Sequence, residues 1–257
     1  DKYQKEFLDY FLDKKNNLNI YFARYKSYEI DHEIKNNNLI LSYSKYGIIN
    51  IETQTLDQSL EIVRRRIDEI GTKEPTILKR GKNRILVELP GLKNPERIKS
   101  LLGKTANLTF RFVGTDASNE FGYEELPSES GDEQLKISRR VIISGENLVD
   151  AQPMMDNLNN EAVVSFKLER LGSQRFGQAT KKNVGKRLAI VLDGKVISAP
   201  FVRESILGGS GQISGDFTFQ TATDLALLLR SGALPAPINI AEERTVGPDL
   251  GEDSIKA

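Results

Sequence analysis

The sequence predicts an α+β protein built from a ferredoxin-like base and a second α+β subdomain, which we call the head. Between residues 39 and 114, strand and helix patterns follow one another in the order β-α-β-β-α-β. That order is typical of the ferredoxin-like split βαβ arrangement. Similar patterns return over residues 139–240, beyond an acidic interval. We therefore expect a base with a four-stranded antiparallel sheet and two helices on one face, followed by a separate head.

The first base helix has the clearest pattern. It is expected to begin at Thr55, which forms a Thr-x-x-Gln capping pattern with Gln58, and to end at Gly71. Its apolar residues recur at helical spacing and form one stripe, made of Leu56, Leu60, Val63, Ile67 and Ile70. We expect this stripe to be buried against the base sheet.

A run of three arginines, Arg64 to Arg66, lies within the same helix, close to Asp68 and Glu69. Opposite charges three or four residues apart on a helix form surface ion pairs. The run is therefore interpreted as a solvated face of the helix and not as an anion-binding site.

Turn residues and a proline bound the other base elements. Asn94 and Pro95 are a good helix start, because proline fits the first helical position. The expected strands cover residues 39–43, 76–79, 84–89 and 108–113, and the second helix ends at Gly103. Residues 1–47 are expected to form part of the base or to pack on it, with an amphipathic helix carrying Phe7, Leu8, Phe11 and Leu12 and a strand at Ile20–Tyr25.

Residues 115–138 are rich in acidic residues, Ser and Gly, and we predict a solvated linker there. The head is assigned to residues 139–240, and residues 241–257 to a return segment. Asp193-Gly194 is a strong hairpin signal within the head. The other expected head elements are strands at 141–144, 162–168 and 238–243, a helix from Ser173, a glycine-rich stretch at 208–215 and a helix at 220–231.

Composition excludes several classes of function. Lys plus Arg and Asp plus Glu both number 36, so no basic excess favours nucleic acid. Apolar runs are far shorter than a membrane span requires. With no cysteine and a single histidine, His32, neither a zinc site nor a Ser-His-Asp triad is expected. We predict that the chain is not an enzyme and needs no metal or cofactor.

Two apolar pairs next to turn residues are candidates for contact with a client polypeptide. Met154 and Met155 follow Pro153 in a stretch that is interpreted as a loop, and methionine suits adaptable binding surfaces. Phe201 and Val202 follow Pro200. The alternatives are that these four residues line an apolar cleft or that they fill the core.

Pro235 and Pro237 are the candidate hinge residues. Proline restricts its own backbone and that of the residue before it. Together with residues 115–138, this segment is expected to connect the base and the head and to let the head rotate.

Three stretches resemble the bacterial SecD family in order and spacing. They are Gln58–Ile67 with Gly71–Thr76 and Val87–Gly91; Asn183–Lys186 with Leu192–Pro200 and Gly208–Gly215; and Ala226–Pro237 with Glu243–Pro248. The resemblance covers most of residues 55–250, and residues 1–50 match it only weakly. The chain is thus similar to the large first periplasmic domain of SecD, and its start at Asp1 fits a fragment of a longer protein.

The resemblance implies a function that composition alone does not. SecD-like proteins are accessory subunits of the Sec translocase that use the proton gradient to draw preproteins across the bacterial inner membrane. It implies a periplasmic location, unfolded preprotein as the client, and SecF and a SecYEG-type translocon as partners of the full-length protein. The alternative function is a ferredoxin-like porter or regulatory domain that binds a small molecule.

Overall fold

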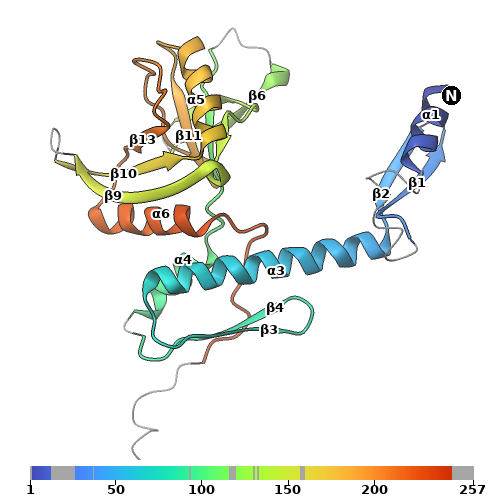
Figure 1. Ribbon diagram of the computed structural model, residues 1–257, viewed down its shortest axis with the longest axis horizontal. Helices are drawn as coiled ribbons and strands as arrows, with labels where there is room; N and C mark the ends of the chain where they lie inside the picture. Colours follow the sequence, from blue (N-terminus) through green and yellow to red (C-terminus); the bar gives the residue numbers. More distant parts are fainter. Residues whose placement is uncertain are drawn as a thin grey trace, which may run out of the picture. The chain divides into compact units, whose positions relative to one another are not determined.

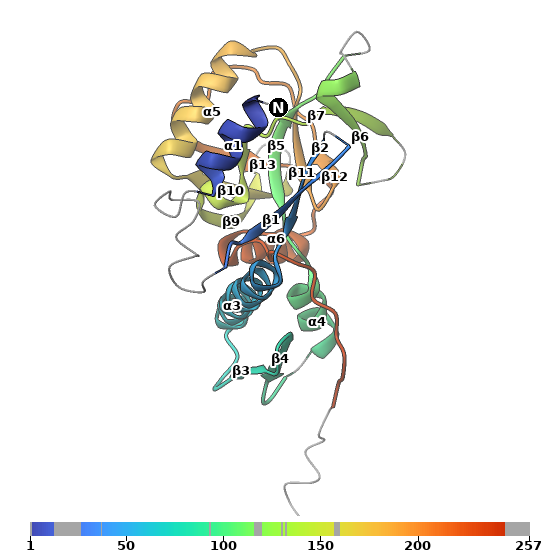
Figure 2. The same cartoon turned by 90° about the vertical axis from the view of Figure 1, so that its right-hand side faces the viewer.

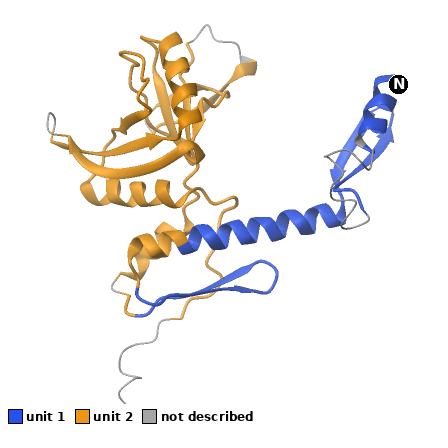
Figure 3. Cartoon of the chain, viewed as in Figure 1, with its two compact units in different colours: residues 1–64, 73–90 blue, residues 65–72, 91–257 orange. Residues whose placement is uncertain are grey.

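The computed structural model describes residues 2–12, 27–36, 38–92, 94–115, 120–129, 131, 133–156 and 160–244. These residues form an α+β protein whose named strands all pair antiparallel. The chain divides into two compact units, residues 1–64 with 73–90 and residues 65–72 with 91–257 (Figure 3). Each unit is described by itself.

The first unit contains two separate β-hairpins and most of a long helix. Strands β1 (Ile30–Lys35) and β2 (Asn38–Tyr43) pair with each other, and so do β3 (Thr76–Arg80) and β4 (Arg84–Glu88). Helix α1 (Lys2–Phe11) precedes them, as expected for the amphipathic segment at the start of the chain. The predicted strand at Ile20–Tyr25 lies outside the described residues.

Helix α3 (Lys45–Ile70) is longer than the sequence pattern predicts. Ser44 is buried and caps the helix, because its Oγ accepts a hydrogen bond from the backbone N–H of Gly47 at 3.0 Å. The expected start at Thr55 is therefore wrong. A capping pattern acts only where the preceding backbone is not helical, and here the helix runs through Thr53, whose Oγ1 bonds back to Ile49 O. The predicted end at Gly71 is confirmed, with φ +78° and its N–H bonded to Ile67 O.

The apolar stripe of α3 is confirmed by burial. Val63 and Ile67 are buried, and Leu60 and Ile70 are half-buried. The arginine run next to the stripe behaves differently from its prediction. Arg64 and Arg65 are exposed, but Arg66 has an exposed fraction of 0%.

The four strands expected to form the base sheet do not lie in one sheet. β2 pairs with β1, β3 pairs with β4, and β5 (Leu108–Phe112) lies in another sheet of order β12-β11-β5-β8. β5 pairs along its whole length with β11 (Leu188–Leu192), a run of apolar residues that are nearly all buried. In the middle of a sheet, both edges of a strand are paired and its apolar side chains are covered by neighbours. This position buries more apolar surface than an outer position in the predicted base sheet would. The predicted ferredoxin-like sheet over residues 39–114 is corrected accordingly.

The main core of the second unit lies among a four-stranded sheet, a three-stranded sheet and the helices α5 (Arg170–Lys182) and α6 (Phe219–Ser231). Figures 1 and 2 show how these elements are arranged. The four-stranded sheet is completed by β8 (Ile143–Ser144) and β12 (Lys195–Ser198). The three-stranded sheet has the order β13-β10-β9, with β9 at Leu148–Asp156, β10 at Glu161–Leu168 and β13 at Ser210–Ile213. Helix α4 (Pro95–Gly103) also belongs to this unit, and α6 runs beneath β9 in both views.

Three phenylalanine rings form the centre of this core. Phe110 of β5, Phe166 of β10 and Phe176 of α5 are all buried. Their ring centroids are 5.3 Å apart for Phe110 and Phe166, 5.8 Å for Phe110 and Phe176, and 6.4 Å for Phe166 and Phe176, in tilted or edge-to-face geometry. The two sheets and α5 therefore share one packed interior.

Residues 115–138 are not the solvated linker that their acidic composition predicts. They contain strands β6 (Tyr123–Pro127) and β7 (Gln134–Ser138), which pair as a hairpin after the short 3-10 helix η2 (Glu120–Gly122). Leu135 and Ile137 are buried against Ala189, Val191 and Val196. The strand alternates, so its apolar side chains face the core while its polar neighbours face water.

Two further predictions at the end of the chain have different outcomes. Asp193-Gly194 forms the predicted hairpin turn between β11 and β12, with φ +49° and +81°. The strand predicted at Ile238–Glu243 does not form, and this segment pairs with none of the described strands. In the described part of the chain, no helix combines the length and the apolar character that crossing a membrane requires.

Candidate functional site

The most unusual polar group of the second unit is the guanidinium of Arg66, which is completely buried near the end of α3. It donates hydrogen bonds to backbone carbonyl oxygens from two parts of the chain. Nη1 bonds to the carbonyls of Leu101 at 2.8 Å, Leu102 at 3.1 Å and Lys104 at 2.6 Å, and Nη2 to those of Thr105 at 3.4 Å and Gly232 at 3.2 Å.

These carbonyls belong to the ends of two helices. α4 ends at Gly103 and α6 ends at Ser231, with Gly232 as its C-cap. The last carbonyls of a helix have no partner within the helix, and they carry the negative end of its dipole. A single buried cation therefore satisfies the carboxyl ends of both helices, and it joins α3, α4 and α6.

The charge on Arg66 is costly to bury. Burial lowers the pKa of Arg66 to about 10, while the nearby negative charge of Asp193 opposes that shift. The side chain remains protonated at neutral pH. The two Nη atoms make all the bonds to the carbonyls, whereas Nε has no hydrogen-bond partner among the described residues.

Asp193 holds the loop that supplies part of this carbonyl set. Its carboxylate accepts hydrogen bonds from Thr105 Oγ1 at 2.5 Å, from the Ala106 N–H at 3.1 Å and from the Asn107 N–H at 2.8 Å. Ala106 has φ +59°, a left-handed conformation that these bonds help to hold. The hairpin turn of the head thus fixes the loop between α4 and β5.

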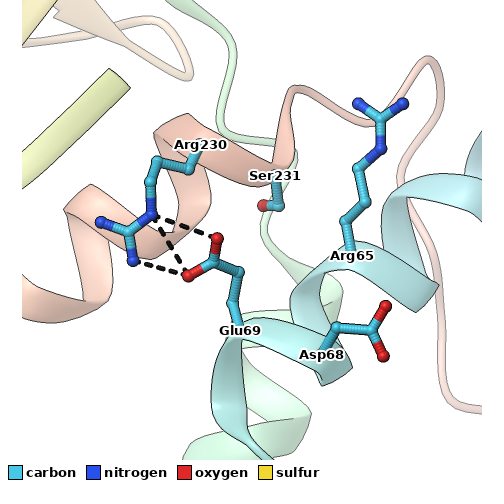
Figure 4. Close-up of a pocket in the computed structure, with 5 residues that line it drawn as sticks. All are labelled: Arg65, Asp68, Glu69, Arg230 and Ser231. Carbon is cyan, nitrogen blue, oxygen red and sulfur yellow. Dashed lines mark hydrogen bonds and ion pairs between the residues drawn. The ribbon is translucent and has the colours of Figure 1, made fainter. Parts of the chain in front are cut away.

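A second arginine, Arg230, forms an ion pair with Glu69 near the end of α3 (Figure 4). Arg230 of α6 donates from Nε to both carboxylate oxygens of Glu69 at 3.2 Å, and from Nη2 to Oε2 at 2.6 Å. This bond to Glu69 raises the pKa of Arg230. Nη1 of Arg230 also donates to the carbonyl of Ala151 on β9. The pair borders an open depression of about 370 Å³ whose lining also includes Arg65, Asp68 and Ser231.

Further ion pairs and a small apolar cluster complete the contact. Arg97 of α4 bonds to Asp224 of α6 at 2.6 Å. Lys99 pairs with Glu96 and Glu243, and the bond to Glu96 is the main reason its pKa is raised. Leu101, Ala106 and Leu228 are buried together, with Ile70 packed against them. We call the contacts of Arg66 with the ends of α4 and α6, together with these ion pairs, the Arg230–Glu69 pair and this apolar cluster, the Arg66 joint.

The contacts of the Arg66 joint hold α3, α4 and α6 together. Its charged groups are already paired with one another or with backbone carbonyls. In the described part of the chain, no group of three or more His, Cys, Asp or Glu side chains could hold a metal ion.

The sequence contains a signal for Arg66 that the charge pattern hides. Arg66 follows Val63 by three residues and precedes Ile70 by four, so it lies in phase with the apolar stripe. An arginine in phase with buried residues is a candidate for a buried cation. Interpreting Arg64 to Arg66 as one solvated run overlooks the position of Arg66 in the apolar stripe.

The four predicted client-contact residues are not brought together. Met154 and Met155 lie on β9 and not in a loop, with exposed fractions of 44% and 43%, and as neighbours on a strand they face opposite sides. Phe201 is 65% exposed. Val202 is only 5% exposed and belongs to the main core, so its assignment to a binding cleft is wrong. A second depression, of about 500 Å³, lies along α5 and includes none of the four.

The candidate hinge residues lie directly after the joint. Leu234 is buried, and its N–H donates to the Thr105 carbonyl at 2.8 Å. From Pro235 to Arg244 the described chain forms no helix or strand. Pro235 and Pro237 therefore begin the irregular segment that leaves the head.

Two family models match the chain. One, described as SecDF, P1 head subdomain, matches residues 123–236. The other, described as protein translocase subunit SecDF, P1 domain, N-terminal, matches residues 56–115. Together they cover more than half of the chain, and each of them includes part of the Arg66 joint.

Curated relatives agree with the family models. The protein translocase subunit SecD of Rickettsia conorii is 46% identical over 240 residues, which is 89% of this chain and 46% of the relative. SecD of Magnetococcus marinus is 43% identical over 242 residues, or 88% and 46%. SecD of Acetobacter pasteurianus is 48% identical over 210 residues, or 79% and 40%. The chain spans about half the length of these relatives.

Solved structures have the same fold. A structure described as a membrane component SecDF that enhances protein export has a TM-score of 0.64 and 32% identity, and the match covers 76% of this chain and 94% of that one. SecDF in its super-membrane-facing form has a TM-score of 0.65 and 34% identity, with coverage of 79% and 29%. The chain belongs to the bacterial SecD family and corresponds to the P1 domain of this protein translocase subunit.

Proposed function

We propose that this chain is the part of a Sec translocase accessory subunit that binds the emerging preprotein on the periplasmic side of the bacterial inner membrane. The full-length protein, together with SecF and a SecYEG-type translocon, would assist translocation driven by the proton gradient. The observation that carries the proposal is the match of both P1 family models across residues 56–115 and 123–236. The names of the relatives as translocase subunits support it.

The head is the part that we assign to preprotein binding. It exposes Met154, Met155 and Phe201, three large apolar side chains that could contact an unfolded chain. The net charge of the whole chain is zero, so the attraction would come mainly from apolar contact and backbone hydrogen bonds. A protein that passes its client on has to release it, and we expect affinity in the micromolar range or weaker, about −8 kcal/mol or less favourable.

The binding test is an NMR titration of the chain with an unfolded preprotein segment. We expect amide shifts confined to the head, and an affinity that changes little with salt, because exposed charges contribute little to it. Absence of shifts at millimolar peptide, or shifts outside the head only, would contradict the proposal. Replacing Met154, Met155 and Phe201 with serine tests the choice of residues, and binding that survives in this variant would show that these side chains contribute little to it.

We further propose that the head rotates about the segment that contains Pro235 and Pro237. The chain has no cysteine, so two can be introduced for spin labels without interference. Labels at Leu171→Cys on α5 of the head and at Glu242→Cys beyond the two prolines report the distance across this segment, and both positions are exposed.

The expected result of this experiment is a distance distribution that broadens when Pro235 and Pro237 are both replaced by glycine, because glycine frees the backbone that proline restricts. A single narrow distribution that does not change in the double variant would show one rigid body and contradict the hinge. The matched control replaces Pro200, a proline elsewhere in the head, with glycine.

A further inference from the structure

β9 is the outer strand of the three-stranded sheet. In the order β13-β10-β9, one side of β9 pairs with β10, and no strand among the described residues pairs with its other side. An outer strand presents a row of backbone N–H and C=O groups that another chain can use for pairing.

Ala151 shows which backbone groups face outwards. Its N–H donates to its neighbour Asp150 Oδ1 at 2.8 Å, and its carbonyl accepts from Nη1 of Arg230. Neither partner is on β10, so the backbone groups of Ala151 face away from that strand. Direction alternates along a strand, which makes Pro153 and Met155 face outwards as well. Pro153 agrees with this, because a proline within a sheet belongs where its missing N–H faces away from the ladder.

The open part of the edge is short. The groups of Ala151 are already occupied, and Arg230 is held in place there by Glu69. Val149 is bulged out of register, since Lys167 pairs with Asp150 while Leu168 pairs with Leu148. Proline and bulges limit uncontrolled strand pairing at an edge.

What remains is the carbonyl of Pro153 and the N–H and carbonyl of Met155. These groups point away from β10, and no other group in the described part of the chain forms a hydrogen bond with them. We call Pro153 to Met155 the β9 edge window. The side chains of Met154 and Met155, which are half exposed, border it on the two faces of the sheet.

We propose that an extended polypeptide segment adds to the β9 edge window as a further strand and is recognised mainly through its main chain. This inference rests on the proposed function and specifies where and how the client binds. Main-chain pairing is available to every sequence, which suits a protein that handles many clients. Only three backbone groups are offered, so binding is weak and release is easy. The flexible methionine side chains adapt to whatever side chains the client places beside them.

The first test needs no variant of the protein. A short uncharged peptide rich in Ser, Thr and Val is titrated into the 257-residue chain and followed by NMR, and so is the same peptide N-methylated at each central residue. The methyl groups remove the donors of the peptide and obstruct strand pairing. We expect the plain peptide to shift the Met155 amide and its neighbours, and the methylated peptide to bind about tenfold more weakly or worse.

The second test changes the window itself. Met155→Pro removes one outward N–H, and Met155→Ala keeps that N–H but removes the side chain. We expect the proline variant to lose most of the affinity and the alanine variant to stay within about threefold of the original chain. The amide spectrum of each variant reports whether β9 remains folded, and the peptide comparison stands by itself if the proline variant does not fold.

The outcomes separate this inference from the proposed function. If neither peptide nor preprotein segment binds, the proposed function itself fails. If both peptides bind equally, or if the shifts lie in the head away from β9, the function stands and strand addition at the β9 edge window is overturned.

Discussion

Replacing Arg66 with methionine is expected to lower the free energy of unfolding by about 3–5 kcal/mol. Methionine fills much of the volume and removes the cost of burying a charge. It donates no hydrogen bond, however, and it leaves the carbonyls of Leu101, Lys104 and Gly232 without the donors they have now. Each buried polar group left unpaired costs about 1–3 kcal/mol. The loss of several acceptors at once outweighs the gain from removing the charge.

Urea unfolding of the chain measures this effect, and the arginine run supplies the control. Arg65 is the adjacent residue of the same helix, and it is exposed. Arg65→Met should therefore change the unfolding free energy by about 0.5 kcal/mol or less. Equal effects of the two substitutions would show that the buried hydrogen bonds of Arg66 contribute little.

Lysine in place of Arg66 refines the same test. A lysine keeps the charge but concentrates its donors on a single nitrogen, whereas arginine reaches both helix ends with two. We expect Arg66→Lys to lower the free energy of unfolding, but by less than Arg66→Met does. A lysine variant as stable as the original would mean that charge alone, and not the planar guanidinium, holds the two helix ends.

Replacing Phe176 with alanine is expected to cost about 3–5 kcal/mol, because it removes a buried ring and leaves a cavity between two sheets and a helix. Phe176 is buried, and its ring lies 5.8 Å from that of Phe110 and 6.4 Å from that of Phe166. The neighbouring rings belong to strands in different sheets, so they cannot close the cavity without disturbing both.

Thermal or urea unfolding measures this loss, with Phe121→Ala as the matched control. Phe121 is 95% exposed, and its removal should change stability by about 0.5 kcal/mol or less. A loss below about 1 kcal/mol for Phe176→Ala would mean that the core relaxes around the missing ring. It would also weaken the view that one interior joins the two sheets.

Local patterns were enough to predict most single elements of this protein. Helix α4 begins at Pro95 after the Asn94 cap, and the Asp193-Gly194 turn joins β11 to β12, because both depend on residues next to one another in the chain. The family resemblance was also carried by the sequence, since long stretches keep both residue type and spacing. The α+β class followed from the same observations.

Only the tertiary structure shows which distant elements pair or pack with one another. β5 has the pattern of a base strand, but it pairs with β11 of the head, because an apolar strand is buried best in the middle of a sheet. The acidic stretch before Arg139 looked solvated, yet Leu135 and Ile137 turn inwards against β11. Composition averages over both faces of a strand and cannot show this.

The candidate site depended on tertiary structure even more. Met154 and Met155 were identified from the sequence as possible contacts, but only sheet order shows that they lie on an outer strand and that Val202 does not accompany them. Arg66 was hidden within a charged run. Its role arises because the ends of α4 and α6 meet at one point, and the carbonyls gathered there stabilise a cation that no local pattern could place.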